Sequence, residues 1–212
     1  ACYNTTMNNE PVKKISPYHH GNLKEELLQT ATEMIDKEGI DSITLRDLTQ
    51  RLGTSRTAVY RHFASKEALI LGVIEKGYEQ LDKMFTPIFE DRTQSVAQRF
   101  NAMAREYLDF AIEHPNLYRL LFGDKYHQER EELCDYRDES QATGLYALIG
   151  LLVEGQEEGS IAAVNPMVQA AMAWASIHGL ASLLIDGHLM MSDNIEVIYE
   201  YSIEALLKGL KG

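Results

Sequence analysis

Apolar residues recur every three or four positions along most of this chain, which is the spacing of amphipathic α-helices. Asn22 is a candidate N-cap for the first helix, and Gly39 is the kind of residue that ends one. A second long apolar series runs from Leu69 to Leu81, and no stretch beyond Pro87 alternates as a β-strand does. The pattern predicts an all-α protein of about nine helices.

The C-terminal two thirds of the chain contains several apolar series, each interrupted by proline, glycine or a polar run. The helices expected here cover, in chain order, about residues 95–113, 117–122, 124–155, 166–186 and 193–210. The third of them begins in the strongly charged residues 124–141, which we expect to be exposed.

Residues 43–69 predict two short helices joined by a tight turn, followed by the start of a third. The spacing predicts Thr44 as the N-cap of the first of these helices, with Asp47 three residues on as the partner of a capping box. Gly53 supplies the turn, and Ser55 can cap a second helix from Arg56 to His62. This arrangement is a helix-turn-helix, with Ser65 as the cap of the helix that follows.

The second helix of this unit has one face for the core and another for a partner. Val59 and Phe63 lie on the buried side, so Thr57 and Arg61 point away from it at 100° per residue. When such a helix enters a major groove, arginine can bind guanine and small apolar groups can meet the thymine methyl. We therefore expect base contacts from Arg46, Arg56, Arg61, Thr57 and Ala58, and phosphate contacts from Thr44, Ser55, Tyr60, His62 and Lys66.

These residues also carry a family resemblance. The runs T-L-R-D-L, L-G-T-S-R-T-A-V-Y-R-H-F and S-K-E-A-L resemble the DNA-binding domain of the TetR family of bacterial regulators. Residues 18–23 look like the lead-in to the first helix of many members, so the resemblance covers about residues 18–70. Farther on, residues 173–180 (A-W-A-S-I-H-G-L) resemble a C-terminal pattern found in a subset of TetR-like regulators.

Residues 1–17 are polar, contain Pro11 and Pro17 and show no period, so we expect a flexible arm there. The resemblance implies a helix-turn-helix domain at 18–66 and a helical effector-binding and dimerisation domain at 67–212. It implies a cytoplasmic, ligand-responsive repressor that binds a palindromic operator as a homodimer, through helices 166–186 and 193–210. It also supports phosphate roles for Thr44, Tyr60, His62 and Lys66. Family members bring glutamine or proline at the positions of Arg56 and Thr57, so the resemblance implies no operator sequence.

The net charge of −12 is unusual for a DNA-binding protein, but it is unevenly distributed. Residues 1–66 have a balance of +1, whereas residues 67–212 have a balance of −13. An acidic body is compatible with DNA binding, because exposed charges are screened beyond about 8–10 Å at physiological salt. The nearly neutral first domain predicts modest non-specific affinity and reliance on dimerisation.

Length and cysteine content exclude several other classes. No apolar run approaches the ~20 residues that span a bilayer, and no hydrophobic signal core is visible, so we expect a cytoplasmic protein without a membrane segment. Cys2 and Cys134 match no metal or redox spacing and are expected to be free thiols. Residues 1–6 precede Met7, and the sequence leaves open whether they are native.

The C-terminal part contains aromatic and methionine residues that either line an effector cavity or form ordinary core. They are Phe100, Met103, Tyr107, Phe110, Tyr118, Phe122, Tyr146, Met172 and Trp174. His178, on an apolar helix, is typical of a core histidine with satisfied hydrogen bonds and is also a candidate ligand contact. The acidic excess leaves a cationic effector open, although charge runs such as 129–139 are usually solvated.

Two other functions stay open: a helical protein-interaction module whose helix-turn-helix does not read DNA, and a helical enzyme without a short motif. No phosphate loop, zinc-protease motif or nucleophile elbow is present, so we expect no catalysis and no cofactor. Asp124, His127 and Glu131 have a metal-like spacing but lack a second ligand set, so we expect no metal.

The residues before the first helix are further candidates for phosphate contacts. They are Lys13, Lys14, Tyr18, His19 and His20.

Overall fold

The computed structural model describes residues 22–126, 144–190 and 192–211, and all regular elements in them are helices. The all-α prediction is therefore confirmed, with nine α-helices in the described part of the chain. Their bounds are α1 (Leu23–Glu38), α2 (Leu45–Leu52), α3 (Arg56–Tyr60), α4 (Lys66–Glu90), α5 (Val96–Glu113), α6 (Pro115–Phe122), α8 (Gly144–Glu157), α9 (Pro166–Ile185) and α10 (Ile195–Lys211). Three short 3-10 helices, η1 (Ile40–Ser42), η2 (Asp124–Tyr126) and η3 (Ser192–Asn194), lie between them.

Several helices end at residues other than those expected from the sequence. α3 ends at Tyr60, two residues before His62, and α8 continues two residues past Gly155. α4 continues through Pro87 to Glu90, because a proline in the last turn removes only one backbone hydrogen bond. Asn22 does stand at the N-cap of α1, but its side chain makes no capping hydrogen bond. Most of the predicted charged helix start at 124–141 lies outside the described residues.

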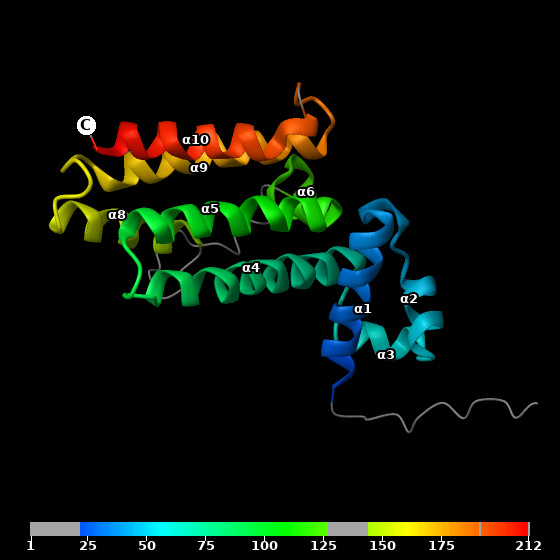
Figure 1. Cartoon of the computed structure of the whole chain (residues 1–212). Coiled ribbons are helices and arrows are strands. Elements are labelled where there is room, and N and C mark those ends of the chain that lie inside the picture. Colours follow the sequence, from blue (N-terminus) through cyan, green and yellow to red (C-terminus); the bar gives the residue numbers. More distant parts are fainter. Residues whose placement is uncertain (1–21, 127–143, 191, 212) are drawn as a thin grey trace, which may run out of the picture.

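α1 packs against α4, α2 packs against α1, and α3 packs against α2. These three helices and the first turns of α4 are called the head below. Figure 1 shows the head at one end of α4. Its core consists of apolar side chains at helical spacing that are completely buried, namely Leu27, Ile35, Leu48, Val59 and Leu69. Burial of such side chains is the main stabilising contribution in a unit this small. The apolar residues that the sequence places at helical spacing are thus the residues that form the core of the head.

The rest of α4 together with α5, α6, α8, α9 and α10 is called the body. α9 packs on α5 and α8, and α9 and α10 lie along the side of the body away from α4 (Figure 1). α6 sits directly on α4, where an added Cβ at Gly77 would be 2.7 Å from the Leu121 side chain. The absence of a side chain at Gly77 lets the two helices approach closely.

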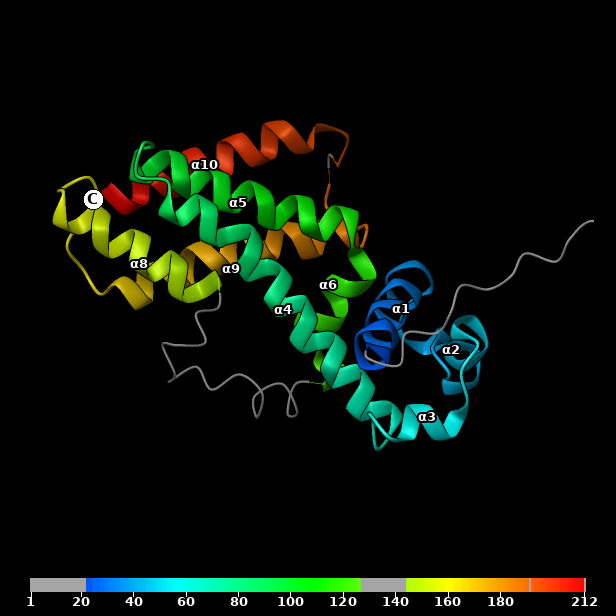
Figure 2. The ribbon, with the colours of Figure 1, turned by 90° about the horizontal axis from the view of Figure 1, so that it is seen from below.

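α6 also contacts the head and the end of α9 (Figure 2). His114, at the corner between α5 and α6, is 2.8 Å from the carboxylate of Asp36 on α1, and the Asn116 amide donates to the Asp36 carbonyl at 2.9 Å. On another side of α6, Arg119 donates to the Ile185 carbonyl at 2.6 Å and to the Asp186 carboxylate at 2.9 Å. α6 therefore bridges the head and the C-terminal end of α9.

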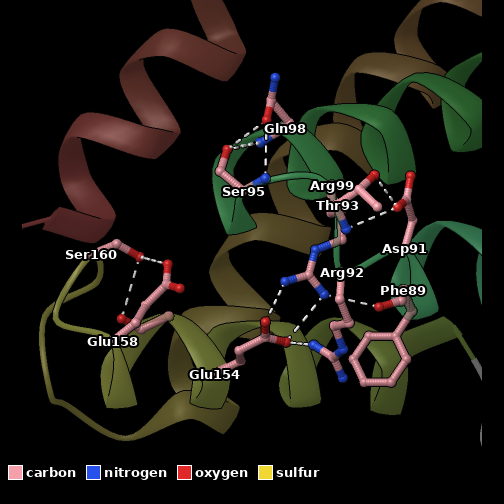
Figure 3. A network of polar contacts seen from close by, with 11 residues as sticks. Phe89, Asp91, Arg92, Thr93, Ser95, Gln98, Arg99, Glu154, Glu158 and Ser160 are labelled. Carbon is pink, nitrogen blue, oxygen red and sulfur yellow. Dashed lines mark hydrogen bonds and ion pairs between the residues drawn. The ribbon is translucent and has the colours of Figure 1, made fainter.

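A polar network holds α4, α5 and α8 together at the end of the body far from the head (Figure 3). Arg99 is only 2% exposed; its guanidinium donates to the Phe89 carbonyl at 2.9 Å and forms two hydrogen bonds with Glu154. Arg92 pairs with the same carboxylate. Burial lowers the pKa of Arg99, yet an arginine pKa is far above neutrality, so the charge persists and needs this partner.

α9 meets the length and composition of a membrane-spanning helix, with a mean hydropathy of 1.4. In this structure one side of α9 is buried against α5 and α8, and core helices of folded proteins meet the same two conditions. The apolar composition of α9 is therefore weak evidence for a membrane span.

Candidate nucleic-acid interface

The turn between α2 and α3 is fixed by two caps and one glycine. The Thr44 hydroxyl accepts from the Asp47 N–H at 3.1 Å and donates to the Asp47 carboxylate at 2.6 Å, which starts α2. Gly53 ends α2 with φ of 62°, the left-handed conformation that a residue with a Cβ rarely adopts. The Ser55 hydroxyl then accepts from the Ala58 N–H at 3.1 Å and starts α3. Both predicted N-caps are confirmed.

The early end of α3 has a local cause. The backbone N–H groups of His62 and Phe63 both donate to the Val59 carbonyl at 2.9 Å, so the last turn tightens. This turn directs the Phe63 ring into the head's core, where it is 6% exposed. Arg61 and His62 stay on the surface beside the end of α3.

The base-contact candidates lie on an open surface of the head. Arg46, Arg56, Thr57 and Arg61 are exposed, and Ala58 is half-buried. Within the described residues the three arginines make no ion pair, whereas the nearby Arg51 pairs with Glu38 at 2.6 Å. The guanidinium donors of Arg46, Arg56 and Arg61 are thus available to an external acceptor.

The phosphate-contact candidates differ in what they can still donate. Thr44 has already used its hydroxyl proton on Asp47, so its contact to a phosphate would displace that bond. The Ser55 hydroxyl only accepts within the described residues and keeps its proton for another acceptor. Tyr60 and His62 are exposed, and Lys66 is half-buried at the start of α4. This surface can supply several donors to one stretch of nucleic-acid backbone.

Five of the candidate effector residues lie together in the body. Tyr107 and Tyr118 place their hydroxyl oxygens 3.2 Å apart, and both lie within hydrogen-bond distance of His178 Nδ1, at 2.9 and 2.6 Å. The Trp174 indole N–H donates to Tyr107 at 3.3 Å, and the Phe122 ring contacts His178 and Trp174. Burial raises the pKa of both tyrosines and lowers the pKa of His178, so all three groups are neutral near pH 7.

The other candidates are dispersed. Phe100, Met103 and Phe110 are buried in the core, Tyr146 is half-buried in the first turn of α8, and Met172 is exposed on α9. A groove of about 320 Å³ lies elsewhere, between α1–η1 and α6–η2, and none of the candidate effector residues lines it. Of the larger set, the structure brings together one cluster, namely Tyr107, Tyr118, Phe122, Trp174 and His178.

Sequence reasoning missed the residues by which α6 holds the head and α9, namely His114, Asn116 and Arg119. Pro115 was the local signal that a helix begins here, but their partners are 66 to 80 positions away in the chain. Of the other candidates, Lys13, Lys14, Tyr18, His19, His20, His127 and Glu131 lie outside the described residues, as does Cys134. Within the described ranges, no three His, Cys, Asp or Glu side chains are grouped to hold a metal.

Comparison with known proteins adds family matches over most of the chain. A family model described as bacterial regulatory proteins, tetR family, matches residues 27–73. A second, described as the tetracyclin repressor-like C-terminal domain, matches residues 100–206, about half of the chain.

Individual relatives and solved structures agree with these matches. Over 115 residues the chain is 36% identical to nucleoid occlusion factor SlmA of Vibrio cholerae, which covers 54% of this chain and 58% of SlmA. It is similar to a protein of unknown function from Rhodococcus sp. RHA1 (TM-score 0.78, 28% identity, 93% of this chain and 100% of the other). It shares its fold with a TetR-family transcriptional regulator from Pectobacterium atrosepticum (TM-score 0.66, 21% identity, 88% of this chain and 93% of the other).

Proposed function

The chain belongs to the TetR family of bacterial regulatory proteins, and from this premise we propose that it is a ligand-responsive repressor that binds a palindromic operator as a homodimer. The observation that carries the proposal is the surface of the head, where Arg46, Arg56 and Arg61, which make no ion pair with the residues described, lie on and beside the exposed helix α3. The family supports a DNA-binding regulator. The operator, the dimer and the ligand response are the parts that we propose, and we assign the chain no enzymatic activity.

The proposed base contacts come from α3 and from the start of α2. Arg56 and Thr57 occupy the first turn of α3, the end that meets base edges when a recognition helix enters the major groove. Arg46 and Arg61 flank α3. The guanidinium group of each can donate two hydrogen bonds to the O6 and N7 acceptors of a guanine. The candidates for phosphate contacts keep the head in register without reading sequence, and they are Thr44, Ser55, Tyr60, His62 and Lys66.

The proposed dimer interface is the outward face of α9 and α10. Val168, Met172 and Leu183 of α9 and Val197 and Tyr201 of α10 are all exposed in the protomer, Tyr201 to 75%. Exposed apolar side chains gathered along two helices are typical of an association surface. A second copy is the proposed occupant, because the C-terminal family match covers α9 and continues into α10 as far as residue 206.

The middle of this face on α9 is formed by small residues, Ala171, Ala175 and Gly179. A Cβ built on Gly179 would meet no atom within 4 Å, so this position borders open space. Small side chains four residues apart let two helices cross at short distance, so we propose that the two copies of α9 cross here. Binding to a palindrome requires the two heads of this dimer to lie about 34–36 Å apart, the spacing of its half-sites.

The proposed route for a ligand signal is α6. One side of α6 holds α1 through Asp36, another holds the end of α9 through Asp186, and a third carries Tyr118 into the cluster around His178. A ligand that binds one arrangement of these contacts better than another shifts the position of the head. A coupling of about 1–3 kcal/mol would change DNA affinity about 5–150-fold.

A second candidate function comes from the similarity to SlmA, whose name describes a nucleoid occlusion factor. By this candidate the chain would take part in nucleoid occlusion and would not control a neighbouring gene. The chain spans little more than half the length of SlmA in that match, so the similarity supports DNA binding more directly than it supports this role.

The test begins with selection of genomic fragments that the purified protein binds, followed by titration of one fragment beside a random duplex at two salt concentrations. We expect tight binding to the selected fragment, a large preference over the random duplex, and affinity that falls with salt. Sites confined to a few promoters favour the repressor, whereas many dispersed sites favour the nucleoid role. Equal, weak binding to all fragments contradicts both.

The dimer is tested by sedimentation of the wild type beside Leu183→Asp. Leu183 is exposed in the protomer, so a carboxylate there is tolerated by the fold but must be desolvated in the proposed interface. We expect the wild type to sediment as a dimer and the variant as a monomer. Ile112→Asp, at an exposed apolar position on α5, is the matched control and should leave the dimer intact.

A further inference from the structure

A histidine and a carboxylate join the corner between α5 and α6 to α1. His114 is the residue at which α5 ends and α6 begins, and both of its backbone groups are engaged. Its N–H donates to the Phe110 carbonyl at 2.9 Å, and its carbonyl accepts from the Tyr118 N–H at 2.8 Å. The imidazole Nδ1 lies 2.8 Å from Asp36 Oδ2 on α1. The backbone therefore fixes the place from which the imidazole reaches across to the head.

The Asp36 carboxylate is only half satisfied by this contact. Oδ2 has His114 as its partner, whereas Oδ1 is buried and has no hydrogen bond within the described parts of the chain. The Asp36 side chain is 24% exposed, so water reaches only part of it. A carboxylate withdrawn from water in this way is costly unless a positive charge lies beside it.

His114 is the basic group on which the Asp36 charge depends. The other ion pairs at this corner are formed without Asp36, and they are Arg51 with Glu38, Arg119 with Asp186, Lys125 with Asp41, and Lys76 with Glu25 and Glu79. The charged side chains that adjoin the pair along the chain are exposed to solvent, namely Glu33 and Lys37 on α1 and Glu113 on α5. The Phe110 ring, 5.4 Å from the imidazole, is apolar. Among the described residues Asp36 thus has one basic partner.

The contact is stronger when the imidazole carries a second proton. A neutral imidazole donates one hydrogen bond to the carboxylate, whereas an imidazolium adds a positive charge, and a charge-assisted hydrogen bond is roughly twice as strong as a neutral one. Histidine is the side chain whose charge changes between about pH 5 and 8. Asp36 stabilises the added proton only while α1 lies against the corner. By linkage, a fall in pH through this range favours the attached arrangement and a rise in pH weakens it.

We propose that His114 and Asp36 form a proton-sensitive latch between the head and the body. The Asn116 amide, which donates to the Asp36 carbonyl at 2.9 Å, holds the same turn of α1 without a titrating group. Loss of the proton therefore loosens the attachment of the head and does not detach it. The latch is an input separate from the proposed ligand response, and it rests on the proposed function only for its effect on DNA.

The latch itself is tested without DNA, by urea unfolding of the full-length protein at pH 5.5 and pH 8.0. The proteins are the wild type, His114→Asn, Asp36→Asn and the double variant. Asparagine at position 114 keeps an N–H donor near the place of Nδ1 but cannot take up a proton, and asparagine at position 36 removes the charge. We expect the coupling between the two positions, expressed as a ratio of unfolding equilibrium constants, to be about fivefold larger at pH 5.5 than at pH 8.0.

A control and a fallback keep this measurement decisive. His188→Asn, at an exposed position after α9, removes a histidine far from Asp36 in the chain and should show no such dependence on pH. If Asp36→Asn is poorly folded, the difference between the wild type and His114→Asn at the two pH values still decides, since it should grow as the pH falls. A coupling that is equal at both pH values, or absent at both, overturns the proposal.

The effect on DNA is measured by fluorescence anisotropy with a selected genomic fragment at the same two pH values. The ratio of affinities between pH 5.5 and pH 8.0 should differ between the wild type and His114→Asn by about fivefold, with the same salt dependence in both proteins. His62→Asn is the contrasting variant, because His62 is exposed on the DNA-binding surface and its loss should change the salt dependence. The same ratio in the wild type and His114→Asn overturns the regulatory role of the latch. Absence of specific binding at both pH values is instead a failure of the proposed function, and the urea measurements then decide on the latch alone.

Discussion

The arginines of the body and those of the head are used in opposite ways. Four body arginines each pair with a carboxylate, namely Arg92 and Arg99 with Glu154, Arg105 with Glu196, and Arg119 with Asp186. In the head, Arg51 pairs with Glu38, but Arg46, Arg56 and Arg61 have no ion pair in the described parts of the chain. In a chain of net charge −12, unpaired arginines thus gather beside one short helix.

The difference shows what each set can do. A guanidinium already held by a carboxylate has its planar fork occupied, and it links elements of the fold. A guanidinium without a partner keeps the same fork for phosphate or guanine. The local availability of arginine therefore indicates the DNA-binding surface more clearly than net charge does. Three substitutions test this contrast and a fourth tests a half-buried carboxylate of the body; they follow in order of decreasing expected effect.

The largest effect is expected for Glu154→Ala in the body. It would leave Arg99 buried with the Phe89 carbonyl as its one acceptor among the residues that the structure describes. Removal of one partner of a buried pair costs about 3–5 kcal/mol. The free energy of unfolding, measured with urea, should fall by that amount. Glu196→Ala removes the partner of the more exposed Arg105 and serves as the control, with a much smaller expected loss because solvent screens this pair. Equal losses for the two variants would show that burial of Arg99 is not the cause.

Arg56→Ala in the head should weaken binding to the selected operator fragment by about 1–3 kcal/mol and leave the unfolding free energy almost unchanged. Lys66→Ala should instead weaken all sequences alike and reduce the salt dependence of binding. Fluorescence anisotropy with specific and random duplexes at two salt concentrations separates the two. An equal loss on both duplexes for Arg56→Ala would exclude base reading by this residue.

Asp82→Asn tests a body carboxylate whose pKa is raised to about 6, first by burial and then by the charge of Glu79. The folded state binds a proton more tightly than the unfolded chain, so stability falls as pH rises from about 4 to 6 and stays lower above that window. A pKa raised by this much corresponds to at most about 3 kcal/mol of lost folding stability. Partial solvent exposure of Asp82 reduces the expected loss to about 1 kcal/mol. Thermal unfolding should place the variant about 2–4 °C above the wild type at pH 7.5 and level with it at pH 4. A constant difference at both pH values would contradict the assignment.

The smallest effect is expected for Arg51→Ala. Its pair with Glu38 is half exposed, and exposed pairs contribute about 0–1 kcal/mol, so stability should barely change. Because Arg51 lies in the same head as Arg56 but is engaged with Glu38, its loss should also leave operator affinity within about twofold. A loss as large as that of Arg56→Ala would mean that pairing does not decide which arginines bind DNA.

The features that could be predicted from the sequence are those that depend on residues close together in the chain. Thr44, Ser55 and Ser65 were predicted as caps and each accepts the expected backbone N–H, because capping depends on residues three positions apart. The end of α3 could not be predicted, since it is set by the packing of Phe63 in the core of the head.

In the candidate sites, too, local features could be predicted and contacts between distant residues could not. The exposed face of α3 followed from helical spacing alone. Burial of Arg99 was invisible, because its partner Glu154 is 55 positions away and a lone arginine in an apolar pattern is expected on the surface. The His178 cluster was predicted only as part of a larger set, since spacing does not show which aromatic side chains from three different helices meet.

The unbroken course of α4 has a geometric consequence. Its 25 residues make a rod about 37 Å long, at 1.5 Å per residue, with the head at one end and the Arg99 network beside the other. Rotation of such a rod by about 5° about its far end displaces the head by about 3 Å, close to the rise of one base pair. In the proposed dimer the two heads must fit successive turns of one duplex. A small rotation of α4, produced by the adjustment of a few side chains, would therefore be enough to remove that fit.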